Sequence, residues 1–122
     1  MTPFGARLRE LRAKKQVTLA EMAEAVGVSS AYLSALEHGK RGRPSWNLIQ
    51  RVIAYFNIIW DDAEELVKLA RISHPRVTID TSGLDPVATE LANRLAQSIS
   101  SLDRATLHDL MARMGKVTST KH

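Results

Sequence analysis

The amino-acid sequence predicts an all-α protein, with five helices, an extended linker and two further helices. Apolar residues recur at helical spacing along most of the chain. The segments that carry them mostly start at Ser, Thr or Asp, the preferred N-cap residues, and several stop at glycine, which readily adopts the left-handed conformation that ends helices. Residues 73–84, with the sequence SHPRVTIDTSGL, break this periodicity and include Pro75 and Gly83.

The first helix is expected from Pro3 to about Lys15. Thr2 is its N-cap, and proline suits the first helical position because an N–H there would have no partner within the helix. The residues expected to face the core are Phe4, Leu8 and Leu11.

Two short helices joined by a tight turn are predicted next. Thr18 and Glu21 form a capping-box pattern at the start of the first, and Gly27 ends it. Ser29 caps the second, which stops at Gly39, and a basic loop follows. Helix-turn-helix proteins present their second helix to the major groove of DNA in this order of elements. The inward-facing residues are Leu19, Met22, Ala23, Val26, Leu33 and Leu36.

A fourth helix is expected from Ser45 to about Phe56, and a fifth from Asp61 or Asp62. The first turn of the fifth helix is acidic, with Asp61, Asp62, Glu64 and Glu65. Carboxylates are favourable at the positive end of a helix dipole, so we interpret these residues as helix-stabilising rather than metal-binding. The histidines show no ligand spacing, and no metal or other cofactor is expected.

Two amphipathic helices are predicted after the linker. One opens at Asp85-Pro86, and the other starts near Ser101 or Asp103 and stops at Gly115. The predicted organisation is a DNA-binding domain over residues 1–72, an extended linker over 73–84, a helical dimerisation region over 85–115 and a disordered tail over 116–122.

Basic residues concentrate in the first half of the chain. Residues 1–60 carry nine Lys and Arg against four Asp and Glu, residues 61–80 carry three against five, and residues 81–122 carry five against four. A basic half attracts polyanions and speeds their encounter. The alternative is a basic surface that serves solubility alone.

The stretch GVSSAYLSALEHGKRGRP resembles the core of the Cro/CI-type (XRE-type) regulators, which have a phage-repressor-like helix-turn-helix domain. The likeness covers roughly residues 4–70. It rests on Arg12, on Leu19-Ala20 to Gly27, on Leu36-Glu37-x-Gly39 and on Pro44 in one register. The resemblance implies an ion pair between Arg12 and Glu37, with two ordinary surface charges as the alternative. Many members of the family have a glutamine at the position of Leu19, and its side chain contacts the recognition helix or a DNA phosphate. Leucine cannot make this contact, so we expect it to be absent here.

The third helix is expected to lie in the major groove. It has no Arg, Asn or Gln for bidentate base contacts, so base readout should be modest and DNA shape should contribute. Tyr32 is expected to meet a phosphate or sugar, or alternatively to be a core aromatic. The expected DNA-binding residues are Thr18, Ser29, Ser30, Ala31, Tyr32, Ser34, His38, Lys40, Arg41 and Arg43.

The two C-terminal helices carry apolar stripes that must be buried. They pack either back on the first five helices or, as we favour, against the same helices of a second chain, with Val77 to Ile79 as a possible strand pair. A homodimer would place two recognition helices on a palindromic operator, with half-sites about 34 Å apart. The expected dimer-interface residues are Val87, Leu91, Leu95, Ile99, Leu107, Leu110 and Met111.

Other classes of function are disfavoured. The chain of 122 residues is 44% apolar, has no cysteine, and shows neither a secretory signal nor an apolar run of the ~18 residues that a membrane span needs. No catalytic constellation or phosphate-binding glycine loop is found, so no enzyme is expected. We predict a dimeric repressor of the bacterial or phage cytoplasm, associated with the nucleoid. Two alternatives remain. The first is an antitoxin with an autorepressing domain, and the second is an adaptor that no longer binds DNA.

Overall fold

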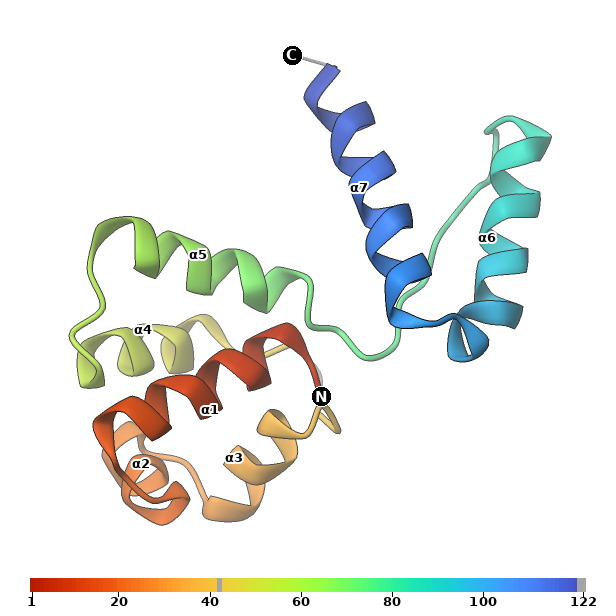
Figure 1. Ribbon diagram of the computed structural model, residues 1–122. Coiled ribbons are helices and arrows are strands. Elements are labelled where there is room, and N and C mark those ends of the chain that lie inside the picture. Colours follow the sequence, from red (N-terminus) through yellow and green to blue (C-terminus); the bar gives the residue numbers. More distant parts are fainter. Residues whose placement is uncertain (42, 121–122) are drawn as a thin grey trace. The chain divides into compact units, whose positions relative to one another are not determined.

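The computed structural model describes residues 1–41 and 43–120, and all regular elements in this part of the chain are helical (Figure 1). The predicted all-α class is confirmed. The chain divides into two compact units, residues 1–77 and residues 78–122. The helices are α1 (Pro3–Lys15), α2 (Leu19–Val26), α3 (Ser30–Glu37), α4 (Trp46–Tyr55), α5 (Trp60–Arg71), α6 (Pro86–Ser98) and α7 (Arg104–Thr120), with a short 3-10 helix, η1 (Ile99–Ser101), between α6 and α7.

In the first unit, α1 to α5 surround one apolar core. Helix α1 contacts α3 and α5, and α2 contacts α3 and α4. The large, fully buried apolar side chains come from all five helices: Phe4, Leu8, Met22, Val26, Leu33, Val52 and Leu66. This shared core fixes the orientation of α3, the predicted recognition helix, relative to the other four.

Side-chain caps start four of these helices as predicted. The Thr18 hydroxyl accepts a hydrogen bond from the Glu21 N–H at 3.1 Å, and the Glu21 carboxylate accepts one from the Thr18 N–H at 3.0 Å, which completes the capping box. The hydroxyls of Thr2, Ser29 and Ser45 cap α1, α3 and α4. Each cap satisfies an N–H that has no partner within its helix.

Helix α5 begins close to the predicted position but has no side-chain cap. It starts at Trp60, just before the predicted Asp61 or Asp62, and its N-cap residue Ile59 makes no side-chain cap bond. Asn57 and Trp60 have φ angles of 53° and 49° in this connection. Few non-glycine residues adopt this left-handed region, so the loop between α4 and α5, rather than a polar cap, sets the start of the helix.

Ser73 completes the first unit. Its side chain is buried, and its Oγ accepts a hydrogen bond from the Phe4 N–H at 2.9 Å while donating one to the Leu69 carbonyl. One serine therefore joins the start of α1 to the end of α5. The sequence predicted a linker from residue 73 onwards, whereas the compact unit extends to Val77.

The second unit contains α6, η1 and α7. Asp85 caps α6 by accepting from the Val87 N–H at 2.8 Å, and Asp103 accepts from the Thr106 N–H at 2.7 Å. Gly115 does not end α7, which continues to Thr120. Residues 121 and 122 of the predicted disordered tail lie outside the described residues.

Two features of the described residues complete the fold. Val77 to Ile79 form no regular element within the single chain described, and their pairing as strands across a dimer stays a prediction. Among the helices that the structure describes, none has the length and apolar character to cross a membrane.

Candidate nucleic-acid interface

The turn between α2 and α3 is held from both sides. Gly27 has φ 77°, and the Val28 N–H bonds the Ala23 carbonyl at 3.0 Å, which closes the end of α2. The Arg51 guanidinium of α4 donates to the Val26 carbonyl at 2.9 Å. A cation at a helix C-terminus satisfies a carbonyl that has no helical partner and offsets the negative end of the dipole. Sequence reasoning missed Arg51, because nothing local in α4 indicates this contact.

The N-terminal end of α3 offers small exposed side chains. Ser30 and Ala31 are exposed, and the Ser29 Oγ accepts from the Tyr32 N–H at 3.1 Å. A hydroxyl that accepts a backbone hydrogen bond still has its own proton to donate to a phosphate oxygen. The same holds for Thr18 at the start of α2. Both predicted phosphate contacts are therefore chemically compatible with the capping role of these residues.

Farther along α3 the predicted contact residues are less exposed than expected. Tyr32 and Ser34 are half-buried, and Tyr32 packs against the apolar core. The alternative reading of Tyr32 as a core aromatic is thus partly right. The Nδ1 of His38 lies 2.8 Å from the Ser34 carbonyl, so this exposed imidazole is held against its own helix.

The basic loop after α3 is exposed. Lys40, Arg41 and Arg43 all present their side chains to solvent, and the Arg41 guanidinium lies 5.7 Å from the centre of the Tyr32 ring. This cation–π distance connects the loop with the recognition helix. Gly42 of this loop lies outside the described residues.

Gly39 provides the turn that starts this loop. Its φ is 75°, and a Cβ at this position would lie 3.0 Å from the methyl carbon of Thr2. Its N–H bonds the Leu36 carbonyl at 3.2 Å, and the Lys40 N–H bonds the Ala35 carbonyl at 2.8 Å. The left-handed backbone and the close contact with the N-terminal segment both favour glycine here.

Arg12 and Glu37, which the resemblance paired, are brought together by the fold. The Arg12 Nε lies 3.0 Å from Glu37 Oε2, and its second terminal nitrogen lies 3.1 Å from Oε1. Glu37 is only 2% exposed. A buried carboxylate needs such a bidentate partner, so the pair fixes the end of α3 against α1. Gly5 allows this approach, because a Cβ there would lie 2.4 Å from the Glu37 carbonyl oxygen.

Glu21, at the edge of the interface, has a carboxyl group whose pKa is shifted. The hydrogen bond from the Thr18 backbone, reinforced by the Thr18 side chain, lowers the pKa of the Glu21 carboxyl below its usual value. A hydrogen bond that stabilises the carboxylate favours its charged form. The capping box therefore forms with the Glu21 carboxyl group deprotonated.

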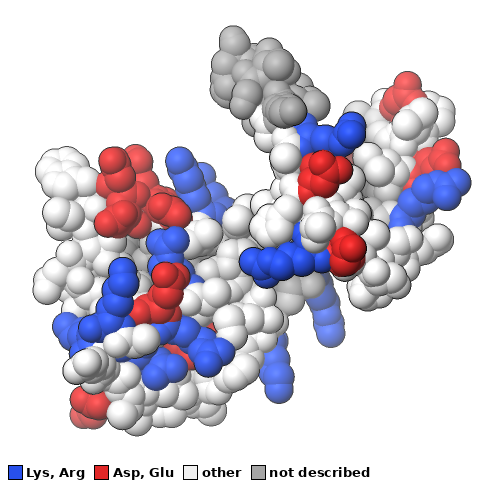
Figure 2. Space-filling view, viewed as in Figure 1, with Lys and Arg blue, Asp and Glu red and all other residues white. Residues whose placement is uncertain are grey.

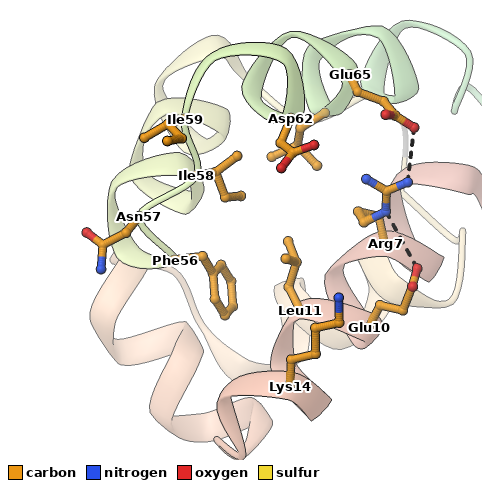
Figure 3. A pocket seen from close by; sticks show the side chains of 11 residues that line it. Arg7, Glu10, Leu11, Lys14, Phe56, Asn57, Ile58, Ile59, Asp62 and Glu65 are labelled. Atoms are coloured by element: carbon orange, nitrogen blue, oxygen red, sulfur yellow. Dashed lines mark hydrogen bonds and ion pairs between the residues drawn. The ribbon is translucent and has the colours of Figure 1, made fainter.

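The remaining charges of the first unit lie on other faces. Figure 2 shows acidic side chains gathered over the start of α5, where Asp61 and Asp62 occupy the first turn. In the groove between α1 and α5, the Arg7 guanidinium lies 3.1 Å from Glu65 and 3.5 Å from Glu10 (Figure 3). These carboxylates make the groove a less favourable place for a polyanion than the basic loop after α3. Within the described residues, no group of three metal-ligating side chains comes together.

The predicted dimer-interface residues lie in the second unit and leave much apolar surface uncovered. Val87 and Leu91 on α6 are 70% and 64% exposed, and Met111 on α7 is 64% exposed. Leu95 and Leu107 are half-buried, whereas Ile99 and Leu110 are exposed. None of the residues of α6 is buried. The structure of one chain therefore does not bury the stripe that the sequence predicted to need burial.

Comparison with known proteins identifies the family of the first unit. Residues 3–66 match the family model described as a helix-turn-helix domain. The chain belongs to this family, and the helix-turn-helix relationship predicted from the sequence is confirmed.

Three curated relatives each match about half of the chain. The uncharacterized HTH-type transcriptional regulator RghRB of Bacillus subtilis is 39% identical over 62 residues, which are 51% of this chain and 45% of that protein. The HTH-type transcriptional repressor RghR of the same species is 36% identical over 61 residues, 50% of this chain and 45% of that protein. SinR, an HTH-type transcriptional regulator of B. subtilis, is 33% identical over 55 residues, 45% of this chain and 50% of that protein. The chain thus spans about half the length of the curated relatives it matches.

A solved complex of the SinR and SinI proteins aligns with 95% of this chain and 98% of that chain, at 22% identity and a TM-score of 0.46.

Proposed function

We propose that this protein binds double-stranded DNA through α3 and regulates transcription, as a repressor that occludes a promoter. One observation carries the proposal, which is the position of α3 in the first unit. The core and the Arg12–Glu37 pair hold the helix in place. Its N-terminal end has small, exposed side chains, and its C-terminal end leads into an exposed basic loop. In helix-turn-helix proteins this arrangement inserts the helix in the major groove and places the loop on phosphates. The names of the relatives, transcriptional regulators and a repressor, support the same reading.

The DNA contacts are divided between two kinds of side chain. Ser30 and Ala31 face base edges, where a hydroxyl can bond either donors or acceptors and a methyl group can touch thymine. Lys40, Arg41 and Arg43 neutralise phosphates and provide most of the affinity. Ser34 and His38 lie toward the groove wall. Because no long side chain on α3 makes bidentate base contacts, specificity depends partly on the shape of the duplex.

The test of DNA binding is selection of bound duplexes from a random pool by the purified protein at physiological salt. We expect enrichment of a two-fold symmetric motif. The double substitution Arg41→Ala and Arg43→Ala should weaken binding and lower the slope of log affinity against log salt by about two, roughly one for each lost phosphate contact. Unchanged affinity in that variant would remove the loop from the interface.

We further propose that the second unit forms a homodimer, so that two α3 helices reach the half-sites of a palindromic operator. The uncovered apolar faces of α6 and α7 support this step, because contiguous exposed apolar surface marks protein–protein contact. The half-site spacing of about 34 Å requires two copies of the first unit on one face of the duplex.

Light scattering tests the dimer. We expect wild-type protein at twice the chain mass of 13.5 kDa, and a monomer after Leu91→Glu, which puts a charge in the apolar face of α6. Ile72→Glu is the matched control, because Ile72 is 64% exposed, as Leu91 is, but lies in the first unit. A Leu91→Glu protein that stays dimeric would contradict the assignment.

If the protein is instead an antitoxin, the apolar faces of α6 and α7 have a different partner. In that case the α6 and α7 faces would hold a toxin of different sequence, and the purified chain would scatter as a monomer while still binding DNA. A toxin gene beside this one, and co-purification of its product, would favour that function over a dimeric repressor.

A further inference from the structure

The end of α3 lies beside a shallow pocket that the sequence did not predict. The pocket has a volume of about 570 Å³ and is lined by Gly39, Lys40, His74, Pro75 and Arg76. Two segments more than thirty positions apart in the sequence therefore meet here: the start of the basic loop and the chain just after α5. Sequence analysis placed the second of these segments in an extended linker.

Both walls of the pocket are anchored to the core. The Lys40 N–H bonds the Ala35 carbonyl at 2.8 Å, which fixes the first wall to α3. On the other side, the residue before His74 is the buried Ser73, whose hydroxyl joins Phe4 and Leu69. The pocket thus belongs to the packed first unit.

The chemistry of the lining suits an anion. Lys40 and Arg76 each carry a positive charge, His74 adds a ring that can donate a hydrogen bond, and the lining includes no carboxylate. In the described part of the chain, none of the ion pairs involves Lys40 or Arg76. Both cations are exposed, so their charges are available to a ligand.

The position of the pocket identifies which anion it meets. Helix α3 has eight residues and is therefore about 12 Å long, close to the width of the major groove of about 12 Å. When the N-terminal end of α3 faces base edges, its C-terminal end reaches the phosphate rim of the groove. The pocket is at that end and shares Lys40 with the basic loop.

We propose that Lys40, His74 and Arg76 form a second phosphate-binding site, which extends the DNA-backbone contact beyond the loop to the chain that follows α5. This inference rests on the proposed DNA binding and adds a contact outside the helix-turn-helix motif. Phosphate contacts position a protein on the duplex without reading its sequence. The site therefore sets the orientation of the first unit and adds affinity that is independent of the bases.

The test compares single-charge variants of the full chain in fluorescence anisotropy, over a range of salt concentrations. Two labelled duplexes are used, one enriched by selection and one of random sequence. Arg76→Ala should weaken binding about tenfold to both duplexes and lower the salt slope by about one. Arg76→Lys should retain the slope, because it keeps the charge.

Lys14→Ala is the matched control. It removes one positive charge from an exposed position on α1, in the groove between α1 and α5 (Figure 3), away from the proposed site. It should leave the slope unchanged. Thermal unfolding of each variant checks that the first unit remains folded.

Other outcomes overturn the inference in distinguishable ways. Equal effects of Arg76→Ala and Lys14→Ala would show a general effect of net charge, and a loss restricted to the selected duplex would exclude a phosphate contact. Loss of binding in the Arg41→Ala, Arg43→Ala protein but not in Arg76→Ala would refute the second site and leave the proposed function in place. Absence of salt-sensitive binding by the wild-type protein would refute both.

Discussion

The two units of this protein treat their apolar residues in opposite ways. In residues 1–77, apolar side chains from five helices form one buried core, as with Leu8 at 0% exposure, while others such as Trp60 stay exposed. In residues 78–122, α6 has no buried residue, although it carries an apolar stripe that includes Val87 and Leu91. Marginal stability requires burial of apolar surface to offset the entropy of ordering the chain. The first unit meets this requirement within one chain, whereas the second leaves its apolar stripe exposed, as the proposed dimer requires.

The largest effect should come from breaking the buried ion pair of the first unit. Glu37→Ala leaves the Arg12 guanidinium without its bidentate partner and should destabilise the unit by about 3–5 kcal/mol in chemical denaturation. Replacing both residues by apolar ones of similar size, with Arg12→Met and Glu37→Leu, should recover most of this loss. If the double variant is as unstable as Glu37→Ala, the ion pair contributes net stability beyond the cost of burying its two charges.

A matched leucine truncation in each unit sharpens the comparison. Leu8→Ala should lower the free energy of unfolding by about 2–5 kcal/mol at every protein concentration, because it leaves a cavity in a closed core. Leu91→Ala should change the stability of the dissociated chain by less than about 0.5 kcal/mol, because its site is exposed there. Its effect should instead appear as weaker self-association in sedimentation equilibrium. Equal losses of unfolding free energy at low concentration would contradict the distinction.

Removing the Ser73 hydroxyl tests where the first unit ends. Ser73→Ala leaves the Phe4 N–H buried without an acceptor, and we expect a loss of about 1–3 kcal/mol. Ser100→Ala, at an exposed serine of the second unit, serves as the control and should have no measurable effect. A negligible loss at Ser73 would place the boundary before this residue, where the sequence predicted it.

The smallest effect should come from the capping box of α2. Thr18→Ala should destabilise the first unit by about 1 kcal/mol. The lowered pKa of Glu21 means that its carboxylate favours the folded state above the usual pKa, and this contribution is lost as the pH falls through the lowered value. Stability measured from neutral to acidic pH should therefore decline less steeply in Glu21→Gln, which has no carboxyl group to protonate, than in the wild-type protein. Parallel pH profiles would show that the box does not form in solution.

The helices of the first unit were predictable because their signals are local. Thr18, Ser29 and Ser45 start their helices as caps, and Gly27 ends α2, since each acts through backbone groups a few residues away. The same local reasoning failed at Gly115, where α7 continues to Thr120. A glycine permits a left-handed turn but does not enforce one.

The candidate site was predictable only in part. The basic loop and the exposed Ser30 and Ala31 follow from the position of α3 after the turn, but the half-burial of Tyr32 and Ser34 does not. Arg51 gave no signal at all, because its partner, the Val26 carbonyl, is twenty-five residues away in sequence.

The sequence by itself determined the helices, their caps, the basic loop and the presence of apolar stripes in both halves, because these depend on residues within one or two turns of each other. Only the tertiary structure decided which stripes are buried, that Ser73 belongs to the first unit, and that His74 and Arg76 lie beside Lys40. Contacts of this kind depend on the packing of five helices around one core, and no local pattern encodes which distant segments that packing brings together.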